Sequence, residues 1–221
     1  MISRVSRLVI ATTNPGKIRE IRRVLEGAPL TLVTLADLSA VVEPEETGRT
    51  FAENARLKAR HYADASGLPT VAEDSGLAID ALGGRPGVES ARYPGATYAD
   101  KFANLYQELA GHPRPWSARF ICALAFVDQA PGERPKAPAG TDASLRSPEA
   151  WSLRPVAYEC EGIVSGEVIA TPRGANGFGY DPIFFYPPYG KTLGEATDAE
   201  KLVVSHRGQA FRQFRAWLVA R

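Results

Sequence analysis

Apolar and polar positions along the chain alternate in a way that predicts strands and helices in turn. The apolar run at 8–11 ends in a Thr-Thr-Asn-Pro-Gly turn, after which apolar residues recur with helical spacing at positions 18, 21, 24 and 25. A second strand is predicted at 30–35. Strand, tight turn and helix in this order are typical of the start of an α/β domain.

The clearest helix is predicted from 50 to 66. Thr50 and Glu53 form a capping box at its start, and Gly67 follows where a left-handed C-cap would lie. Asn54 and Lys58 are four residues apart and therefore share a face of this helix. A short strand is predicted at 70–72, and it ends in the polar sequence Glu-Asp-Ser-Gly.

The remaining pattern predicts a mixed sheet. A helix is expected at about 98–110, a period-2 strand at 118–126, and two shorter strands at 156–160 and 164–170. A capping box at Thr197 and Glu200 begins the C-terminal helical part, where Phe211, Phe214 and Leu218 share one face. Because the middle section is hairpin-like, we expect an α/β fold whose sheet is not purely parallel.

We expect residues 1–221 to form a single domain. Within it, the segment 129–155 contains five prolines and no Ile, Val or Phe. Such a segment buries little apolar area, so it is predicted to be a flexible loop insertion between two strands.

Composition excludes several classes of protein. Lys plus Arg number 26 and Asp plus Glu 25, a net charge of +1, which provides no general field for nucleic acid or an anionic membrane. Cys122 and Cys160 are too few for a disulfide framework or a four-ligand zinc site. No signal peptide is apparent, and the longest apolar stretch, 120–127, is far shorter than the ~20 residues that span a bilayer. A cytoplasmic protein without nucleic-acid or membrane partners is expected.

The first turn is a candidate phosphate site. It consists of Thr12, Thr13, Asn14, Pro15, Gly16 and Lys17. Free backbone N–H groups and the helix dipole at such a position favour a bound phosphate, and the lysine adds a full charge. It is not a Walker A loop, which needs glycine at position 11 and Ser or Thr at position 18. A plain turn with a surface lysine is the alternative.

Carboxylates suggest a metal. Glu45 and Glu46 lie in a predicted loop, and Glu73 and Asp74 follow a predicted strand, where α/β proteins often build their sites. Mg²⁺ usually takes one or two carboxylates together with waters and substrate phosphates, so a sparse acidic set suits it. The alternatives are a solvated acidic loop and an ordinary turn.

Two further motifs suggest a nucleoside. Glycines on both sides of Phe178 would let a flat ligand approach, and its ring could stack on a base. His206 and Arg207 begin the last helix, with Lys201 shortly before them. A glycine-rich turn with a core Phe and an exposed helix start are the respective alternatives. Together with Lys17, Lys58 and Arg92, these residues suit a nucleoside triphosphate with Mg²⁺, whereas no zinc-hydrolase spacing or Ser-His-Asp arrangement is evident.

In order along the chain, these motifs resemble the inosine triphosphate pyrophosphatase family. The resemblance is carried by the 12–17 turn, Glu-Glu-Thr-Gly at 45–48, Thr-Phe-x-Glu-Asn-Ala-x-x-Lys-Ala at 50–59, and Glu-Asp-Ser-Gly-Leu at 73–77. It continues through Leu-Gly-Gly-x-Pro-Gly at 82–87, Ser-Ala-Arg-Tyr at 90–93, Gly-Phe-Gly-Tyr-Asp-Pro at 177–182, and Ser-His-Arg-Gly at 205–208. Thr13 and Glu73 depart from the Gly and Asp that are common in the family.

The resemblance implies a fold, an activity and a site. The fold is a mixed, strongly twisted central sheet flanked by helices, with the active-site cleft between two lobes, and the protein is a homodimer. The activity is hydrolysis of ITP, dITP and XTP between the α and β phosphates, which yields the monophosphate and pyrophosphate. Asp74 would be the catalytic proton acceptor and would hold Mg²⁺ with Glu45. Substrate would be bound by Thr12, Thr13, Asn14, Pro15, Gly16, Lys17, Lys58, Ser75, Arg92, Phe178, Gly179, Tyr180, Asp181, Lys201, His206 and Arg207.

Base selection follows from donor chemistry. If Lys201 and Arg207 are the polar groups of the base pocket, it can only donate, which suits the 6-oxygen of hypoxanthine or xanthine and not the amino group of adenine. Exclusion of guanine, which also has a 6-oxygen, must depend on its 2-position. Two alternatives stay open: a Maf-type nucleotide pyrophosphatase with another base preference, and a nucleotide-binding sensor without turnover.

Overall fold

Seven strands form one mixed sheet in the part of the chain that the structure describes, residues 6–38, 41–128 and 155–220 of a computed structural model. The predicted loop insertion at 129–155 lies outside these ranges except for its last residue. The strand order is β2-β1-β3-β4-β5-β6-β7, with β1 parallel to β2 and β3 and every other pair antiparallel. The predicted mixed α/β fold is confirmed.

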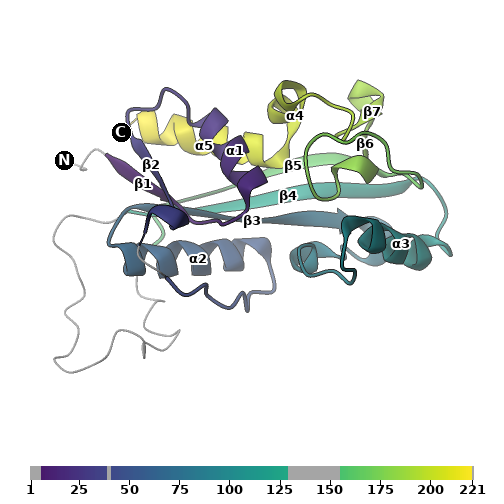
Figure 1. Cartoon of the computed structure of the whole chain (residues 1–221), viewed down its shortest axis with the longest axis horizontal. Coiled ribbons are helices and arrows are strands. Elements are labelled where there is room, and N and C mark those ends of the chain that lie inside the picture. Colours follow the sequence, from purple (N-terminus) through teal and green to yellow (C-terminus); the bar gives the residue numbers. More distant parts are fainter. Residues whose placement is uncertain (1–5, 39–40, 129–154, 221) are drawn as a thin grey trace.

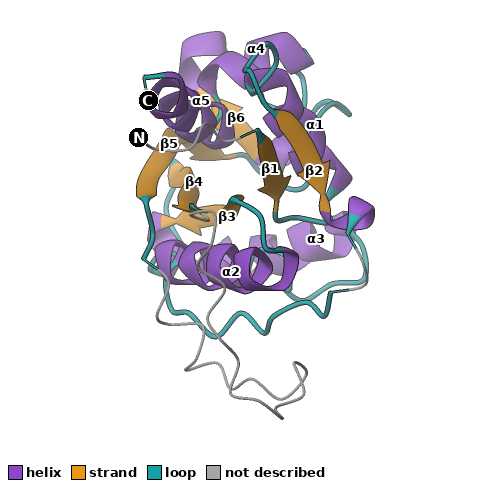
Figure 2. Ribbon diagram, turned by 90° about the vertical axis from the view of Figure 1, so that its left-hand side faces the viewer, coloured by secondary structure: helices purple, strands orange, loops and turns teal. Residues whose placement is uncertain are grey.

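The strands are β1 (Arg7–Ile10), β2 (Thr31–Thr34), β3 (Thr70–Ile79), β4 (Trp116–Val127), β5 (Tyr158–Val168), β6 (Phe184–Tyr186) and β7 (Lys191–Thr192). The helices are α1 (Pro15–Val24), α2 (Phe51–Ser66), α3 (Tyr98–Leu109), α4 (Asp198–Val204) and α5 (His206–Val219). Helices α1 and α5 lie on one side of the sheet and α2 on the other (Figures 1 and 2). Among the described residues, no helix is long and apolar enough to cross a membrane.

The predicted caps fix the ends of α2. Thr50 Oγ1 accepts a hydrogen bond from the Glu53 backbone N–H at 3.2 Å, and Glu53 Oε2 accepts one from the Thr50 N–H at 3.1 Å. Gly67 adopts φ 66°, a left-handed conformation that a side chain would disfavour. The chain then turns directly into β3 at Thr70, so α2 runs antiparallel to β3 and packs along it.

Two strand predictions were wrong in extent. β3 does not end before Glu73 but continues to Ile79, and β5 is one strand rather than two. The polar residues in the middle of β3 are tolerated because they find charged partners on α1, α2 and α5. In β5, Gly162 interrupts the apolar pattern, but a Cβ there would collide with the backbone carbonyl of His206, so the glycine lets α5 approach the strand.

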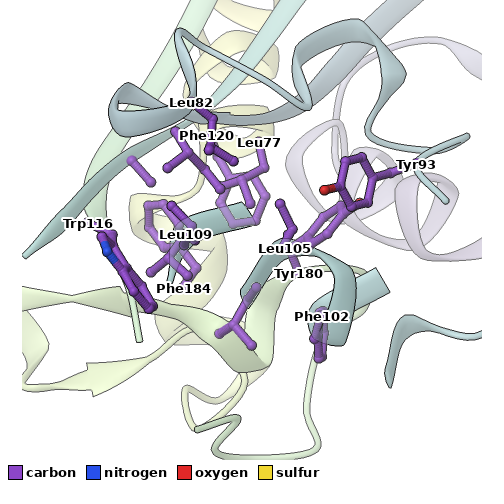
Figure 3. Close-up of a cluster of buried hydrophobic side chains, with 14 of the residues drawn as sticks. Leu77, Leu82, Tyr93, Phe102, Leu105, Leu109, Trp116, Phe120, Tyr180 and Phe184 are labelled. Carbon is purple, nitrogen blue, oxygen red and sulfur yellow. The ribbon is translucent and has the colours of Figure 1, made fainter. Parts of the chain in front are cut away.

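The described residues form three buried hydrophobic clusters, one of which packs α2 against β3 and β4 around Ala59, Ala72 and Ala125. At one end of the long strands, α1 and α5 pack on β1, β3 and β4 around Val71, Phe126 and Phe211. At the other end, a separate cluster around Leu77, Leu105 and Phe184 joins α3 to β3 and β6 (Figure 3). β3 contributes residues to all three clusters.

The polar middle of β3 lies where its parallel neighbour has ended. β1 pairs with β3 only at Val9 with Thr70 and Ile10 with Val71. Beyond that point one edge of β3 is not covered by β1. Side chains alternate between the faces of a strand, so Glu73 and Ser75 point to one face and Asp74 to the other. This uncovered edge of β3 holds the candidate site.

Candidate active site

Two adjoining cavities lie at this edge of β3. The larger, of about 760 Å³, is lined by Ala11, Thr12, Thr13, Asn14, Lys17, Glu43, Pro44, Glu45, Glu46, Lys58, Tyr62, Asp74, Ser75, Val88, Ala91 and Arg92. The smaller, of about 80 Å³, is lined by Asn14, Lys17, Ser75, Gly76, Ser90, Ala91, Tyr98, Phe120, Phe178, Gly179, Tyr180, Asp181, Lys201, His206 and Arg207. They share Asn14, Lys17, Ser75 and Ala91, so one elongated ligand could occupy both.

Asp74 is held by α2. Its Oδ2 accepts a hydrogen bond from Asn54 Nδ2 at 3.1 Å, and its Oδ1 accepts one from Lys58 Nζ at 3.0 Å. The shared face predicted for Asn54 and Lys58 is therefore the face that meets Asp74. The same ammonium also lies 2.6 Å from Glu46 Oε1. One lysine thus connects the carboxylates of a strand and a loop across the larger cavity.

Asp74 is a carboxylate that gives up its proton reluctantly. Burial raises its pKa, the Lys58 ammonium opposes that shift, and the nearby charges of Glu46 and Glu73 add to it. The net direction is upward from the ordinary value. A carboxylate with a raised pKa is a stronger base, which suits a group that accepts a proton from water.

The start of α1 differs from the prediction in one respect. Asn14 Oδ1 accepts hydrogen bonds from the backbone N–H groups of Gly16 at 2.9 Å and Lys17 at 3.2 Å. The expectation of free N–H groups at these two positions is therefore wrong, because the N-cap side chain already satisfies them. What this turn offers a ligand is the dipole of α1 and the ammonium of Lys17.

Behind the cavities, Glu73 is enclosed by cations. Its Oε1 lies 2.8 Å from Lys17 Nζ and 3.3 Å from Arg207 Nε, and its side chain is 1% exposed. Burial would raise the pKa of Glu73, but Arg207 and Lys17 outweigh it and hold that pKa well below its usual range. Glu73 is therefore ionised and connects Lys17, which lines both cavities, to Arg207, which lines the smaller one.

The ion pairs continue from Arg207. Its Nη1 lies 2.7 Å from Glu20 Oε2, the other oxygen of Glu20 lies 2.7 Å from Lys201 Nζ, and Lys201 lies 2.6 Å from Asp181 Oδ2. We call the six residues in this series the charge chain: Lys17, Glu73, Arg207, Glu20, Lys201 and Asp181. Positive and negative groups alternate along it from the larger cavity to the smaller one.

Glu20 makes the fold sensitive to acid. Burial opposes its ionisation, but Arg207 and Lys201 dominate and lower its pKa from 4.5 to about 2. The pKa of Glu20 is lower in the folded than in the unfolded protein, so its ionised form stabilises the fold. This stabilisation is complete above pH 4.5 and is lost as the pH falls towards 2. It amounts to about 3 kcal/mol at neutral pH.

We expect the Glu20→Gln substitution to lower the free energy of unfolding at pH 7. Between pH 4.5 and pH 2 the variant should lose less stability than the wild type, as measured by urea denaturation. Parallel stability curves for the two proteins would contradict this assignment.

Phe178 lies between the smaller cavity and α1. Lys201 Nζ lies 4.3 Å from its ring centroid, and Arg207 Cζ lies 5.5 Å from it. A Cβ on Gly16 would come within 2.6 Å of the Phe178 ring, so a glycine at that position lets the ring pack on α1. The ring is half-buried and lines the cavity, as the base-stacking prediction requires.

The polar groups of the smaller cavity are not only donors. His206 is 5% exposed, stacks on Phe120 at 4.9 Å, and its buried Nδ1 has no hydrogen-bond partner in the described ranges. Burial, followed by the charge of Arg207, holds the pKa of His206 well below its ordinary value, so the ring is neutral. A neutral imidazole has one donor and one acceptor nitrogen. The expected donor-only pocket of Lys201 and Arg207 is therefore incomplete.

Most of the predicted site residues are brought together, and a few are not. Pro15 and Gly16 line neither cavity. Glu45 lines the larger cavity as an exposed side chain, and Arg92 lines it while paired with Glu46 at 3.1 Å. The predicted set omitted Asn54, Glu20 and Tyr62, and it named Glu46 as a candidate carboxylate but not in the final metal pair. For Asn54 and Tyr62, the four-residue spacing with Lys58 was a usable signal.

The donor set of the larger cavity fits a magnesium ion. In the described part of the chain, no three His, Cys, Asp or Glu side chains cluster as an all-protein metal cage would require. Glu46 and Asp74 both contact Lys58 Nζ, and Glu45 lines the same cavity, so these three carboxylates are the candidates for holding an ion there. Mg²⁺ needs only one or two carboxylates when phosphates and waters supply its other ligands.

Comparison with known proteins gives a consistent result. A sequence model described as the Ham1 family matches residues 8–217. A protein from Shigella flexneri named dITP/XTP pyrophosphatase is 43% identical over 211 residues, which cover 94% of this chain and 95% of that protein. A HAM1 protein from Coxiella burnetii has a similar structure, with a TM-score of 0.82, 36% identity, and coverage of 98% of this chain and 100% of that one. The Ham1 protein of Staphylococcus aureus gives a TM-score of 0.77 at 31% identity, covering 97% and 99%.

Proposed function

Because the chain belongs to the Ham1 family, we propose that it is a hydrolase of non-standard purine nucleoside triphosphates, acting on ITP, dITP and XTP. The products are the nucleoside monophosphate and pyrophosphate. The name dITP/XTP pyrophosphatase, given to relatives with over 40% identity along nearly the whole chain, supports this activity.

One observation in the structure carries the proposal. A large cavity lined by cations and carboxylates opens into a small one lined by an aromatic ring, and the two share Lys17 and Ser75. A triphosphate fits the first and a purine base the second. The scissile bond would then lie near Asp74, which lines the larger cavity beside the shared residues.

We propose that Asp74 accepts the proton of the attacking water. Asn54 and Lys58 fix the orientation of its carboxylate through the hydrogen bonds described above. Lys17 and Lys58 line the same cavity and would balance negative charge on the phosphates. Such hydrolysis depends on an aligned water and on charge neutralisation more than on covalent chemistry. One carboxylate base and two lysines are the types of group that these two requirements call for.

We further propose that Asp74, Glu46 and Glu45 would hold Mg²⁺ in this cavity. When bound, the ion would offset phosphate charge and orient the triphosphate. Glu45 was the predicted partner of Asp74, and the contact that Glu46 shares with Asp74 through Lys58 supports adding it to the set.

At the base end, the charge chain would set the selectivity. Lys201 has three N–H donors, of which Asp181 and Glu20 each take one. Because Lys201 lines the smaller cavity, its remaining donor would suit the 6-oxygen of hypoxanthine or xanthine. Adenine would place its amino group there, so that two hydrogen-bond donors, the amino group and the Lys201 ammonium, would face each other. Phe178 would stack on the base.

The resemblance to a family of homodimers supports the further proposal that two copies of this chain associate. Sedimentation of the purified protein tests this, since a dimer and a monomer differ twofold in mass.

A product assay tests the proposed function. We expect ITP and XTP to yield monophosphate and pyrophosphate in the presence of Mg²⁺, with little product from ATP or GTP and little without the metal. Chromatography that resolves mono- from diphosphates would detect the cleavage position. Release of diphosphate and orthophosphate would refute the cleavage site, and equal turnover of all four would refute the base selectivity. Tight ITP binding without turnover would support the non-hydrolysing alternative.

A further inference from the structure

Tyr62 is a buried tyrosine whose hydroxyl has no assigned task. It is 3% exposed, and its ring packs with Ala59, Ala72 and neighbouring residues between α2 and the sheet. Its side chain also lines the larger cavity. Within the described ranges, the hydroxyl makes no hydrogen bond to another residue. The hydroxyl oxygen is not among the fully enclosed polar atoms that lack a partner, so it opens to the larger cavity, where a water or a ligand can accept its hydrogen bond.

The position of Tyr62 along α2 indicates which part of a ligand it meets. Asn54, Lys58 and Tyr62 follow one another at four-residue intervals, so they form a row on one face of the helix. The first two contact Asp74. Tyr62 lies about one turn, or about 6 Å, further towards the C-terminal end of α2.

That end of α2 points away from the base cavity. α2 runs antiparallel to β3, so its last turn is level with the start of β3, where β1 pairs at Val71. The base cavity lies in the other direction along β3, at Ser75 and Gly76. A nucleotide whose base occupies the smaller cavity therefore extends its outer phosphates towards Tyr62.

We propose that the Tyr62 hydroxyl donates a hydrogen bond to the pyrophosphate portion of the substrate, that is, to the β and γ phosphates that leave together. This inference rests on the proposed function. Hydrogen bonds from a hydroxyl to a charged phosphate oxygen are among the stronger ones in proteins. Burial raises the pKa of Tyr62 to about 12, with Glu43 and Glu46 adding to the shift and Lys58 opposing it. The group therefore stays protonated and remains a donor throughout the neutral range.

His61, which precedes Tyr62 on α2, fixes the position of the neighbouring acidic loop. His61 Nε2 lies 2.7 Å from the Val42 carbonyl oxygen, and its ring meets that of Tyr62 edge to face at 5.0 Å. The loop that carries Glu43, Glu45 and Glu46 is thus held against α2 beside the tyrosine. The hydroxyl supplies a neutral donor at the acidic end of the cavity, where a pyrophosphate would otherwise face carboxylates.

Direct binding of inorganic pyrophosphate to the Tyr62→Phe variant tests the proposal. Phenylalanine keeps the packed ring and removes only the hydroxyl, so the fold and the melting temperature should be retained. We expect the dissociation constant of pyrophosphate, measured by titration calorimetry, to rise about tenfold. The KM for ITP should rise similarly, while the affinity for inosine monophosphate, which lacks the outer phosphates, should stay within twofold of the wild type.

The matched control is a variant that removes a tyrosine hydroxyl outside the two cavities. The Tyr106 hydroxyl donates to the Ile169 carbonyl at 3.0 Å and lines neither cavity, so Tyr106→Phe should bind pyrophosphate like the wild type. Unchanged pyrophosphate affinity in Tyr62→Phe would overturn the proposal, as would an equal loss of affinity for the monophosphate. If the wild type binds pyrophosphate but does not release it from ITP, the proposed function fails while the Tyr62 measurement still stands.

Discussion

Asp74→Asn should lower the rate of pyrophosphate release from ITP by about 10³-fold. Asparagine is close to aspartate in shape, so it can stay beside Asn54 and Lys58, but it cannot accept a proton from water at neutral pH. Loss of a general base commonly costs 10² to 10⁴ in rate. The measurement is the initial rate at saturating ITP, together with the dissociation constant of ITP from calorimetry.

The stability of this variant separates chemistry from folding. The charges of Glu46 and Glu73 disfavour ionised Asp74, so removing its charge relieves repulsion while Lys58 keeps Glu46 as a partner. We therefore expect a melting temperature close to that of the wild type. Asp80→Asn is the matched control, because Asp80 is an exposed partner of Arg119 that lines neither cavity. Full hydrolysis by Asp74→Asn would refute the proposed base.

Glu73→Gln should produce a large loss of stability, about 3–5 kcal/mol. The substitution leaves Lys17 and Arg207 facing each other without the carboxylate between them, and removal of one partner from a buried ion pair typically has this cost. Cys122 Sγ, which lies 3.5 Å from Glu73 Oε2, provides no compensating charge. The check is the free energy of unfolding from urea denaturation at pH 7.

An exposed carboxylate provides the comparison for this experiment. Glu108 pairs with Arg85 at 2.6 Å, but both side chains are accessible to solvent, so Glu108→Gln should change stability by less than about 1 kcal/mol. Similar losses in the two variants would mean that Glu73 has no special structural role. A small loss in Glu73→Gln would mean that the charge chain adapts to the missing carboxylate.

The features that were predictable from the sequence are the local ones. The cap at Thr50, the left-handed Gly67 and the shared face of Asn54 and Lys58 all depend on residues within one or two turns of each other. They located α2 and the face that meets Asp74. The ordered motifs, compared with a known family, supplied the mixed fold and the activity.

The parts that were not predictable depend on partners far apart in the chain. Glu20 and Arg207 are separated by 187 positions, and no periodicity connects them. β3 was predicted to end early because its polar middle resembles a turn when the partners of Glu73 are unknown. Tyr62 belongs to none of the sequence motifs, and only its four-residue spacing from Lys58 marks the face of α2 on which it lies.

The balance of positive and negative groups in the charge chain also affects how strongly the site attracts polyanions in general. Its three cations, Lys17, Arg207 and Lys201, are balanced by three carboxylates, Glu73, Glu20 and Asp181, before any ligand arrives. In the larger cavity the acidic side chains outnumber Lys58 and Arg92. Among the described residues, the site therefore has no surplus of positive charge to steer anions in from a distance. Binding therefore depends on contacts made at short range inside the two cavities and not on long-range attraction of anions.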